Sequence, residues 1–228
     1  MTAASQHAPS QASGPYRERF RFERLPASYC HAERLRALLP EGLSSCMRDR
    51  RLQSPRLRHR LSMLLSERFS LSPLTADDLN TAAGRFARLE GEVLTRALRL
   101  AGAIWHAQSL RKIILAEPLR ELIERLGRDD YRTALGAIDL SPAGDNGDED
   151  IDVDALMARI EQDGLLLINA WCHHQPRALG ARLKLKLPPC PAVDDQPPAS
   201  HCDLGEAVVN RVMTVLLADS NSEGDEHG

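Results

Sequence analysis

Cysteines beside histidines are the residues of this chain best suited to chemistry. Cys30 directly precedes His31, and a thiol and an imidazole can act as nucleophile and base or as two metal ligands. The apolar residues around this pair have helical spacing, and neighbouring side chains on a helix point about 100° apart. We therefore expect that Cys30 and His31 cannot form a dyad with each other.

Further metal-binding residue types gather in the second half of the chain. They are the run Cys172-His173-His174, Cys190 and the pair His201-Cys202. Structural zinc sites usually space paired ligands two to four residues apart at tight turns, whereas these are adjacent. We favour a packed Cys172, with the histidines near the carboxyl end of a helix, where a protonated imidazole is stabilised. We expect no metal and no cofactor.

An acidic run invites comparison with a calcium-binding loop. It contains Asp145, Asp148, Asp150, Asp152 and Asp154. If the loop begins at Asp148, Val153 takes the place of the required glycine and Arg159 that of the bidentate glutamate. We expect instead a solvated loop that leads into a helix amino terminus, where carboxylates are stabilised by the helix dipole.

Arginines are concentrated between Arg48 and Arg60. The candidate binding residues here are Arg48, Arg51, Arg56, Arg58 and Arg60. Such a stretch is able to contact phosphates, but the whole chain has 26 Arg and 3 Lys, and no zinc finger or RNA-recognition signature accompanies it. We favour protein contact or a solvated helix face. The alternative is a helical regulator that binds nucleic acid or another protein through Arg48–Arg60.

Signatures of catalysis are missing from the sequence. It has no G-x-S-x-G, no P-loop, no G-x-G-x-x-G after a strand and no H-E-x-x-H. Single histidines on helical segments, such as His59 and His106, are more often packing or surface groups than bases. We therefore expect a protein that is not an enzyme.

The elements that position these residues are predicted to be mainly helices. The chain has 35 Leu and 28 Ala against 7 Val and 8 Ile, so good helix formers dominate. Apolar periodicity predicts a helix from Pro26 to Leu39, one from Pro55 to Phe69 and a long one from Thr75 to Ile104, which Gly102 kinks or breaks. In the second of these, Leu57, Leu61, Leu64 and Leu65 form the inward face. The fold class is a compact multi-helix domain.

Two segments alternate with period two and suggest a minor β element. Arginines alternate with Phe20 and Phe22, and lysines alternate with Leu183, Leu185 and Leu187. This pattern is typical of half-buried strands. We predict one short two-stranded element around 19–23 and 182–187.

Composition along the chain predicts its organisation. We expect a disordered tail at 1–15, a helical domain at 16–187, a Pro-rich linker at 188–202, a C-terminal helix packed on the domain at 203–218 and a disordered acidic tail at 219–228. No secretory signal and no apolar run of about 20 residues is present. We expect a cytoplasmic protein without membrane insertion.

Charge divides the chain into unlike halves. Residues 1–136 carry a net charge of +8, and residues 137–228 carry −11. Because charged surfaces steer and select partners, we hypothesise two binding faces. One is formed by the arginines named above and the other by Asp148, Asp150, Asp152 and Asp154.

Three stretches together resemble the SctK family of bacterial type III secretion systems, which includes the YscK and PscK type. They are FRFERLPASYCHAERLRALLP, RLAGAIWHAQSLRKIILAEPLRELIERLG and RLKLKLP, and the similarity spans roughly residues 19–187. The resemblance implies a non-enzymatic cytoplasmic adaptor at the cytoplasmic face of the injectisome. It would lie in the sorting platform between the cytoplasmic domain of the inner-membrane ring protein SctD and the pod protein SctQ, and indirectly contact the stator SctL and the ATPase SctN.

Overall fold

The computed structural model describes residues 13–142 and 152–225, and all regular elements in these ranges are helices. The prediction of a mainly α fold is confirmed. The helices are α1 (Ser13–Arg24), α2 (Ala32–Arg36), α3 (Ser45–Leu52), α4 (Pro55–Arg68), α5 (Ala76–Asn80), α6 (Ala82–Arg88), α7 (Gly91–Trp105), α8 (Ala107–Lys112), α9 (Ala116–Leu126), α10 (Arg128–Leu135), α11 (Val153–His174), α12 (Arg177–Lys186), α13 (Pro191–Asp194) and α14 (Ala199–Asp225), with 3-10 helices η1 (Pro26–Ser28) and η2 (Ile138–Leu140).

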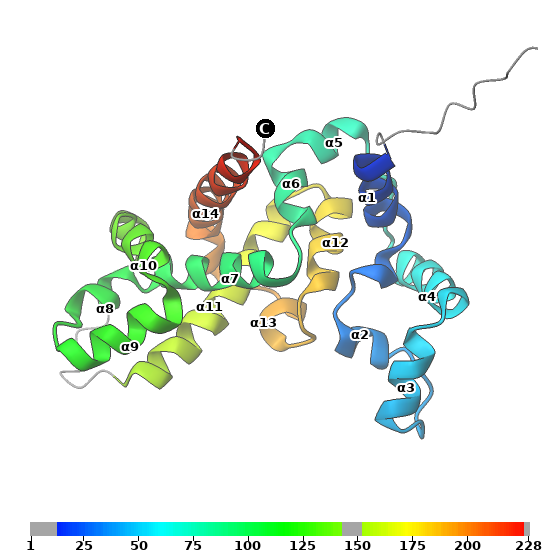
Figure 1. Cartoon of the computed structure of the whole chain (residues 1–228), viewed down its shortest axis with the longest axis horizontal. Coiled ribbons are helices and arrows are strands. Elements are labelled where there is room, and N and C mark those ends of the chain that lie inside the picture. Colours follow the sequence, from blue (N-terminus) through cyan, green and yellow to red (C-terminus); the bar gives the residue numbers. More distant parts are fainter. Residues whose placement is uncertain (1–12, 143–151, 226–228) are drawn as a thin grey trace, which may run out of the picture.

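The helices form a central group with a smaller lobe on each side. Figure 1 shows α6, α7, α11, α12 and α14 in the middle, α8 to α10 on the left and α1 to α4 on the right. The central helix α11 packs against α7, α12 and α14. Its Leu156, Ile160 and Leu167 are fully buried, and Trp171 meets Phe86 edge to face with 5.2 Å between ring centroids. The core therefore lies around α11.

Glycines let α7 and α11 approach closely where they cross. Gly102 of α7 lies against the backbone of Ile160, and Gly164 of α11 lies against the backbone of Leu98. A Cβ on either glycine would overlap the facing carbonyl group, at 2.7 Å from the carbonyl carbon of Ile160 or 2.9 Å from that of Leu98. The prediction that Gly102 breaks its helix is wrong, because α7 continues to Trp105. Gly102 instead allows the close backbone contact.

The prediction of one continuous helix from Thr75 to Ile104 is wrong, because the segment forms three helices, α5, α6 and α7. Thr75 and Asp78 form a capping box at the start of α5. A second N-cap follows at once, since the Thr81 hydroxyl accepts a hydrogen bond from the Gly84 amide at 2.9 Å and starts α6. Each threonine favours a new helix start over continuation. Val93 shares the helical period of this segment but is 46% exposed.

The predicted two-stranded element is wrong, since 19–23 lies in α1 and 182–187 lies largely in α12. Leu183, Leu185 and Leu187 are buried, but Arg182 before them and Lys186 between them are buried as well. A helix that is buried around most of its surface can carry apolar residues at any spacing. The period of two in this segment therefore did not indicate a strand. The two segments do touch, because Arg182 Nη2 donates to the Glu23 carbonyl at 3.2 Å.

The helix predicted from Pro26 to Leu39 is also interrupted, because η1 ends before Tyr29 and α2 begins at Ala32. His31 is the N-cap of α2, where its Nδ1 accepts from the Glu33 amide, and its own amide donates to the Leu185 carbonyl at 2.8 Å. Cys30 is buried beside it. His31 thus caps a helix, and Cys30 belongs to the hydrophobic core.

The Pro-rich segment 188–202 runs along the body. It contains α13, whose Val193 is fully buried, and the Asn169 side chain of α11 donates to the carbonyls of Ala192 and Asp195 at 3.0 and 2.9 Å. The last helix, α14, begins at Ala199 and packs on α11 and α7. Its buried residues are Val208, Val209, Val212, Met213 and Leu216. Most of the tail expected at 1–15 lies outside the described residues.

Candidate functional site

The arginines of α3 and α4 form a positive surface at one end of the molecule (Figure 1). These two helices contain seven arginines and only two acidic residues, Asp49 and Glu67, and Asp49 is paired with Arg36 at 3.0 Å. Arg58 is exposed and forms no ion pair, but its Nε is bonded to a backbone carbonyl, which leaves five other arginines that are exposed and form no ion pair with any residue that the structure describes: Arg50, Arg51, Arg56, Arg60 and Arg68. We call these five residues the arginine surface.

Two of the predicted binding arginines donate hydrogen bonds to backbone carbonyls. Arg48 Nε donates to the Leu43 carbonyl at 2.9 Å. Arg58 Nε donates to the carbonyl of Leu52 at 2.7 Å, which is the last residue of α3, and so ties α4 to α3. Arg51, Arg56 and Arg60 form no such bond with a described residue, so their whole guanidinium groups are available to a partner.

Exposed apolar side chains adjoin the arginine surface, and sequence reasoning missed them. Met63 is 62% exposed and Leu64 is 52% exposed, both on α4, and Phe20 of α1 is 48% exposed. Our placement of Leu64 on the inward face is wrong. The stretch LSMLL at 61–65 has four apolar residues in little more than one turn, which is more than one face can bury. That excess was the available signal.

A groove of about 810 Å³ lies between α1, α4 and the segment after α4. Phe20, Leu25, Met63 and Leu71 supply apolar walls, and Arg24 and His59 supply polar atoms. α4 starts at Ser54 and Pro55, where proline fits the first helical position, and it buries Leu61 and Leu65. That packing turns Met63 and His59 toward the groove.

Arg182 of α12 lines the same groove and is only 1% exposed. Its Nη1 donates to the Ala178 carbonyl at 2.9 Å and its Nη2 to the Glu23 carbonyl. Its Nε has no hydrogen-bond partner, and no described carboxylate forms an ion pair with it. Burial lowers the pKa of this guanidinium, although Tyr29 and Glu23 oppose the effect. The groove thus contains a buried cation that bonds to two backbone carbonyls and interacts with the Tyr29 side chain, but whose Nε has no partner.

The predicted acidic face is only partly described. Asp148 and Asp150, like Asp145 of the calcium-loop comparison, lie outside the described residues. Asp152 is the N-cap of α11 and accepts from the Asp154 amide at 2.9 Å. Asp154 is paired with Arg125 at 2.6 Å, so its charge is partly neutralised. This end of α11 lies across the molecule from α4 (Figure 1).

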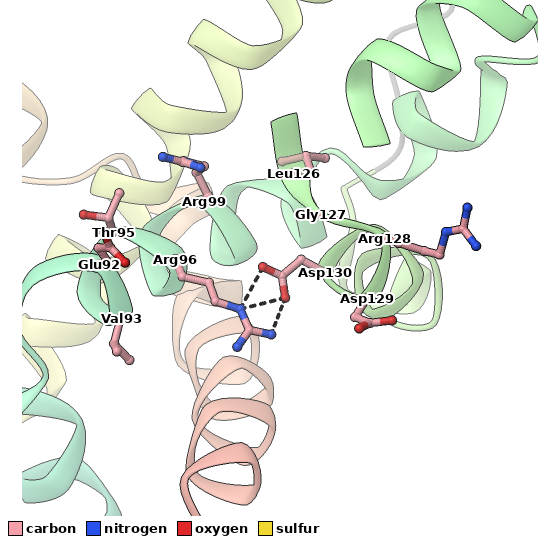
Figure 2. A pocket seen from close by; sticks show the side chains of 10 residues that line it. All are labelled: Glu92, Val93, Thr95, Arg96, Arg99, Leu126, Gly127, Arg128, Asp129 and Asp130. Carbon is pink, nitrogen blue, oxygen red and sulfur yellow. Dashed lines mark hydrogen bonds and ion pairs between the residues drawn. The ribbon is translucent and has the colours of Figure 1, made fainter. Parts of the chain in front are cut away.

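A second cavity, of about 640 Å³, lies between α7 and α10. Arg96 pairs with both carboxylate oxygens of Asp130, with contacts of 2.6 to 3.0 Å. Figure 2 shows this pair in the middle, with Arg99 and Arg128 directed away from it to opposite sides. The polar groups do not converge on a common point, and we assign no ligand to this cavity.

Two histidines converge on one carboxylate between α11 and α14. Asp163 lies 2.6 Å from His106 Nε2 and 3.0 Å from His201 Nε2, through different oxygens. Burial alone would raise the pKa of Asp163, but the hydrogen bonds from both histidines outweigh it and hold the pKa well below its usual range. His201 also stacks on Trp105 at 4.3 Å between ring centroids. This cluster fastens the start of α14 to the core.

The cysteines and histidines weighed as zinc ligands are spread over separate surroundings. Cys172 is buried, and burial raises its pKa to about 12. His173 faces Lys184, and His174 donates from Nδ1 to the Ala170 carbonyl in the last turn of α11. Within residues 13–142 and 152–225, no three His, Cys, Asp or Glu side chains are placed to hold a metal ion. Nor does any helix in these ranges have the length and apolar character needed to cross a membrane.

Comparison with known proteins gives the family. The family described as "YOP proteins translocation protein K (YscK)" matches residues 17–215. "Nodulation protein NolU" of Rhizobium fredii is 34% identical over 174 residues, which cover 75% of this chain and 76% of that protein. The NolU of Sinorhizobium fredii (strain NBRC 101917 / NGR234) matches to the same extent. No solved structure matches. The chain therefore belongs to the YscK family of type III secretion proteins.

Proposed function

We propose that this protein is a non-enzymatic cytoplasmic adaptor of a bacterial type III secretion injectisome. It joins the cytoplasmic domain of SctD to the pod protein SctQ, and through SctQ it reaches SctL and SctN. Membership of the YscK family supports a role in type III secretion. The place between SctD and SctQ comes from the resemblance described above.

One observation carries the proposal most strongly, namely the arginine surface and its apolar neighbours. Charges that have no partner within the described chain are available to a second protein. Exposed Met63 and Leu64 add apolar area beside them. Interfaces combine an apolar centre with a charged rim that steers association. α3 and α4 present both features together.

A bridging protein also needs a second surface, away from the first. The amino end of α11 and the lobe of α8 to α10 lie across the molecule from α4 (Figure 1). Ile114 and Leu115, between α8 and α9, are 85% and 62% exposed. This arrangement leaves room for two partners to bind without overlap.

The test is co-purification of the chain with the SctD domain and with SctQ, separately and together. We expect a ternary complex. The triple variant Arg51→Glu, Arg56→Glu, Arg60→Glu should lose only one partner. A control with the same charge change, Arg85→Glu, Arg120→Glu, Arg159→Glu, also alters exposed arginines outside α3 and α4, and it should keep that partner. Competition between SctD and SctQ for one surface would contradict the bridge.

Nucleic-acid binding through Arg48–Arg60 is a separate outcome of the same experiment. It would appear as a DNA affinity that falls steeply with salt concentration and is lost in the triple arginine variant. If that occurs and neither SctD nor SctQ binds, the adaptor proposal is overturned.

A further inference from the structure

The groove between α1 and α4 has the size and walls of a peptide-binding site. Its volume of about 810 Å³ lies within the range of ordinary ligand pockets, roughly 300–1,000 Å³. Phe20 and Met63 line it and are 48% and 62% exposed, so apolar surface faces water there. Apolar grooves of this kind accept the apolar face of an amphipathic helix.

Arg182 shows which charge belongs in the groove. A buried guanidinium without a carboxylate partner is costly, and a hydrogen-bond donor left unsatisfied adds to that cost. Arg182 meets both conditions, because its Nε has no partner and it is 1% exposed. A carboxylate that entered the groove would lie beside this positive charge and reduce the first of these costs. The groove therefore favours an acidic ligand.

The positive charge continues from the groove onto α4. His59 lines both the groove and an adjoining hollow of about 750 Å³, which Arg56 and Arg60 also line. Arg56, Arg60 and Met63 are four and three residues apart and so follow one stripe of α4. Glu23 and Glu67 also line the groove. Carboxylates on a ligand should therefore gather over Arg182 and over the Arg56 and Arg60 end of α4.

We infer that the groove between α1 and α4 seats an acidic amphipathic helical segment of a partner protein. The apolar side chains of this segment contact Phe20 and Met63, one carboxylate reaches Arg182, and carboxylates one turn apart meet Arg56 and Arg60. This inference rests on the proposed function, because the segment belongs to whichever of SctD or SctQ docks on the arginine surface.

The first experiment measures binding of the full chain to the SctD domain and to SctQ, each on its own. Met63→Asp places a negative charge in the groove and should weaken one of the two complexes by about tenfold or more. Val93→Asp is the matched control, since it puts the same charge on an exposed apolar position of α7, outside the groove and both proposed partner surfaces. It should leave that complex unchanged. Arg24→Glu, on the rim of the groove, should act like Met63→Asp.

The second experiment identifies the bound segment. Met63 is replaced by a photoreactive benzoyl-phenylalanine, and the partner peptide that becomes crosslinked is read by mass spectrometry. We expect a segment with apolar residues at helical spacing and at least two carboxylates one turn apart.

The outcomes separate this inference from the adaptor proposal. If the wild-type chain binds its partners but Met63→Asp and Arg24→Glu bind equally well, the groove inference is overturned and the adaptor proposal stands. A crosslinked segment that is basic or lacks carboxylates overturns the inference as well. If the wild-type chain binds neither SctD nor SctQ, both fail.

Discussion

The glycine contact between α7 and α11 supports a prediction that opposes ordinary helix propensity. Replacing glycine by alanine inside a helix normally stabilises it by about 1 kcal/mol. For Gly102→Ala and Gly164→Ala we predict the opposite, because each new methyl group would overlap a backbone carbonyl of the facing helix. Backbone atoms cannot rotate aside as a flexible side chain can, so the two helices would have to move apart.

The expected cost follows from the core that such a movement disturbs. Inserting one methyl group into a well-packed core costs about 1–3 kcal/mol, and occasionally more. α7 and α11 contribute Leu100, Ile104, Leu156 and Ile160, all fully buried, so separation would loosen several contacts at once. Because the overlap is with backbone atoms, we place the cost at the upper end of this range, about 3 kcal/mol, so after the propensity gain of about 1 kcal/mol is subtracted we expect a net loss of about 2 kcal/mol for each variant. In a chain of this size this would lower Tm by about 4–8 °C.

Urea and thermal unfolding, followed by circular dichroism, would measure these changes. Gly136→Ala is the matched control. Gly136 caps α10 with φ −71°, and a Cβ there would lie 3.4 Å from the nearest atom, which is ordinary contact. This variant should be neutral or slightly stabilising. If Gly102→Ala and Gly164→Ala are as stable as Gly136→Ala, the close crossing of α7 and α11 is refuted.

Three further predictions concern stability and pH. Asp163→Asn should destabilise by about 2 kcal/mol near pH 7, because two charge-assisted hydrogen bonds weaken. The pKa of Asp163 is lower in the folded than in the unfolded protein, so the stability that its carboxylate contributes is present above the unfolded pKa of about 3.9 and is lost as pH falls toward the folded pKa. Wild type should therefore lose more stability than Asp163→Asn between pH 5 and 3. Urea titrations at several pH values would measure this difference. Burial lowers the pKa of Lys186 to about 7 in the folded protein, so between pH 7 and 10.5 the folded protein no longer carries this destabilising buried charge. Wild type should therefore gain about 1–2 kcal/mol of unfolding free energy relative to Lys186→Met between pH 7 and 9. Parallel curves of stability against pH for the two proteins would contradict this. Thr81→Ala should cost about 1 kcal/mol by removing the N-cap of α6, whereas an equal loss in Thr95→Ala, an exposed mid-helix site, would argue against the cap.

Sequence patterns predicted the fold class and the residues at which several helices begin, but not the residues at which helices end. The capping box at Thr75 was readable because its residue types and spacing are local. The break at Leu89 and Glu90 was not, since the run from Leu79 to Ile104 keeps a helical period throughout. The helical period of apolar residues is the same whether a segment forms one helix or two successive helices that both pack on the core. It therefore does not show where the backbone turns between them.

The site was predicted in part for the same reason. Arg51, Arg56 and Arg60 were predicted from charge clustering, and their side chains are exposed in the structure; their role in binding stays a prediction. Arg182 was not, because the burial of a lone arginine depends on α1 and α12 coming together across about 160 positions of sequence. Its importance arises from what surrounds it, and a single sequence does not display that.

The length of α11 has a consequence for how partners would be spaced. Its 22 residues form one uninterrupted rod of roughly 33 Å, which is fastened along its length by α7, α12 and α14. Proteins held on the two proposed surfaces on either side of this core would keep a constant separation instead of tumbling on a tether. The chain would then act as a ruler, and each copy in a repeating assembly would hold its neighbours at the same offset.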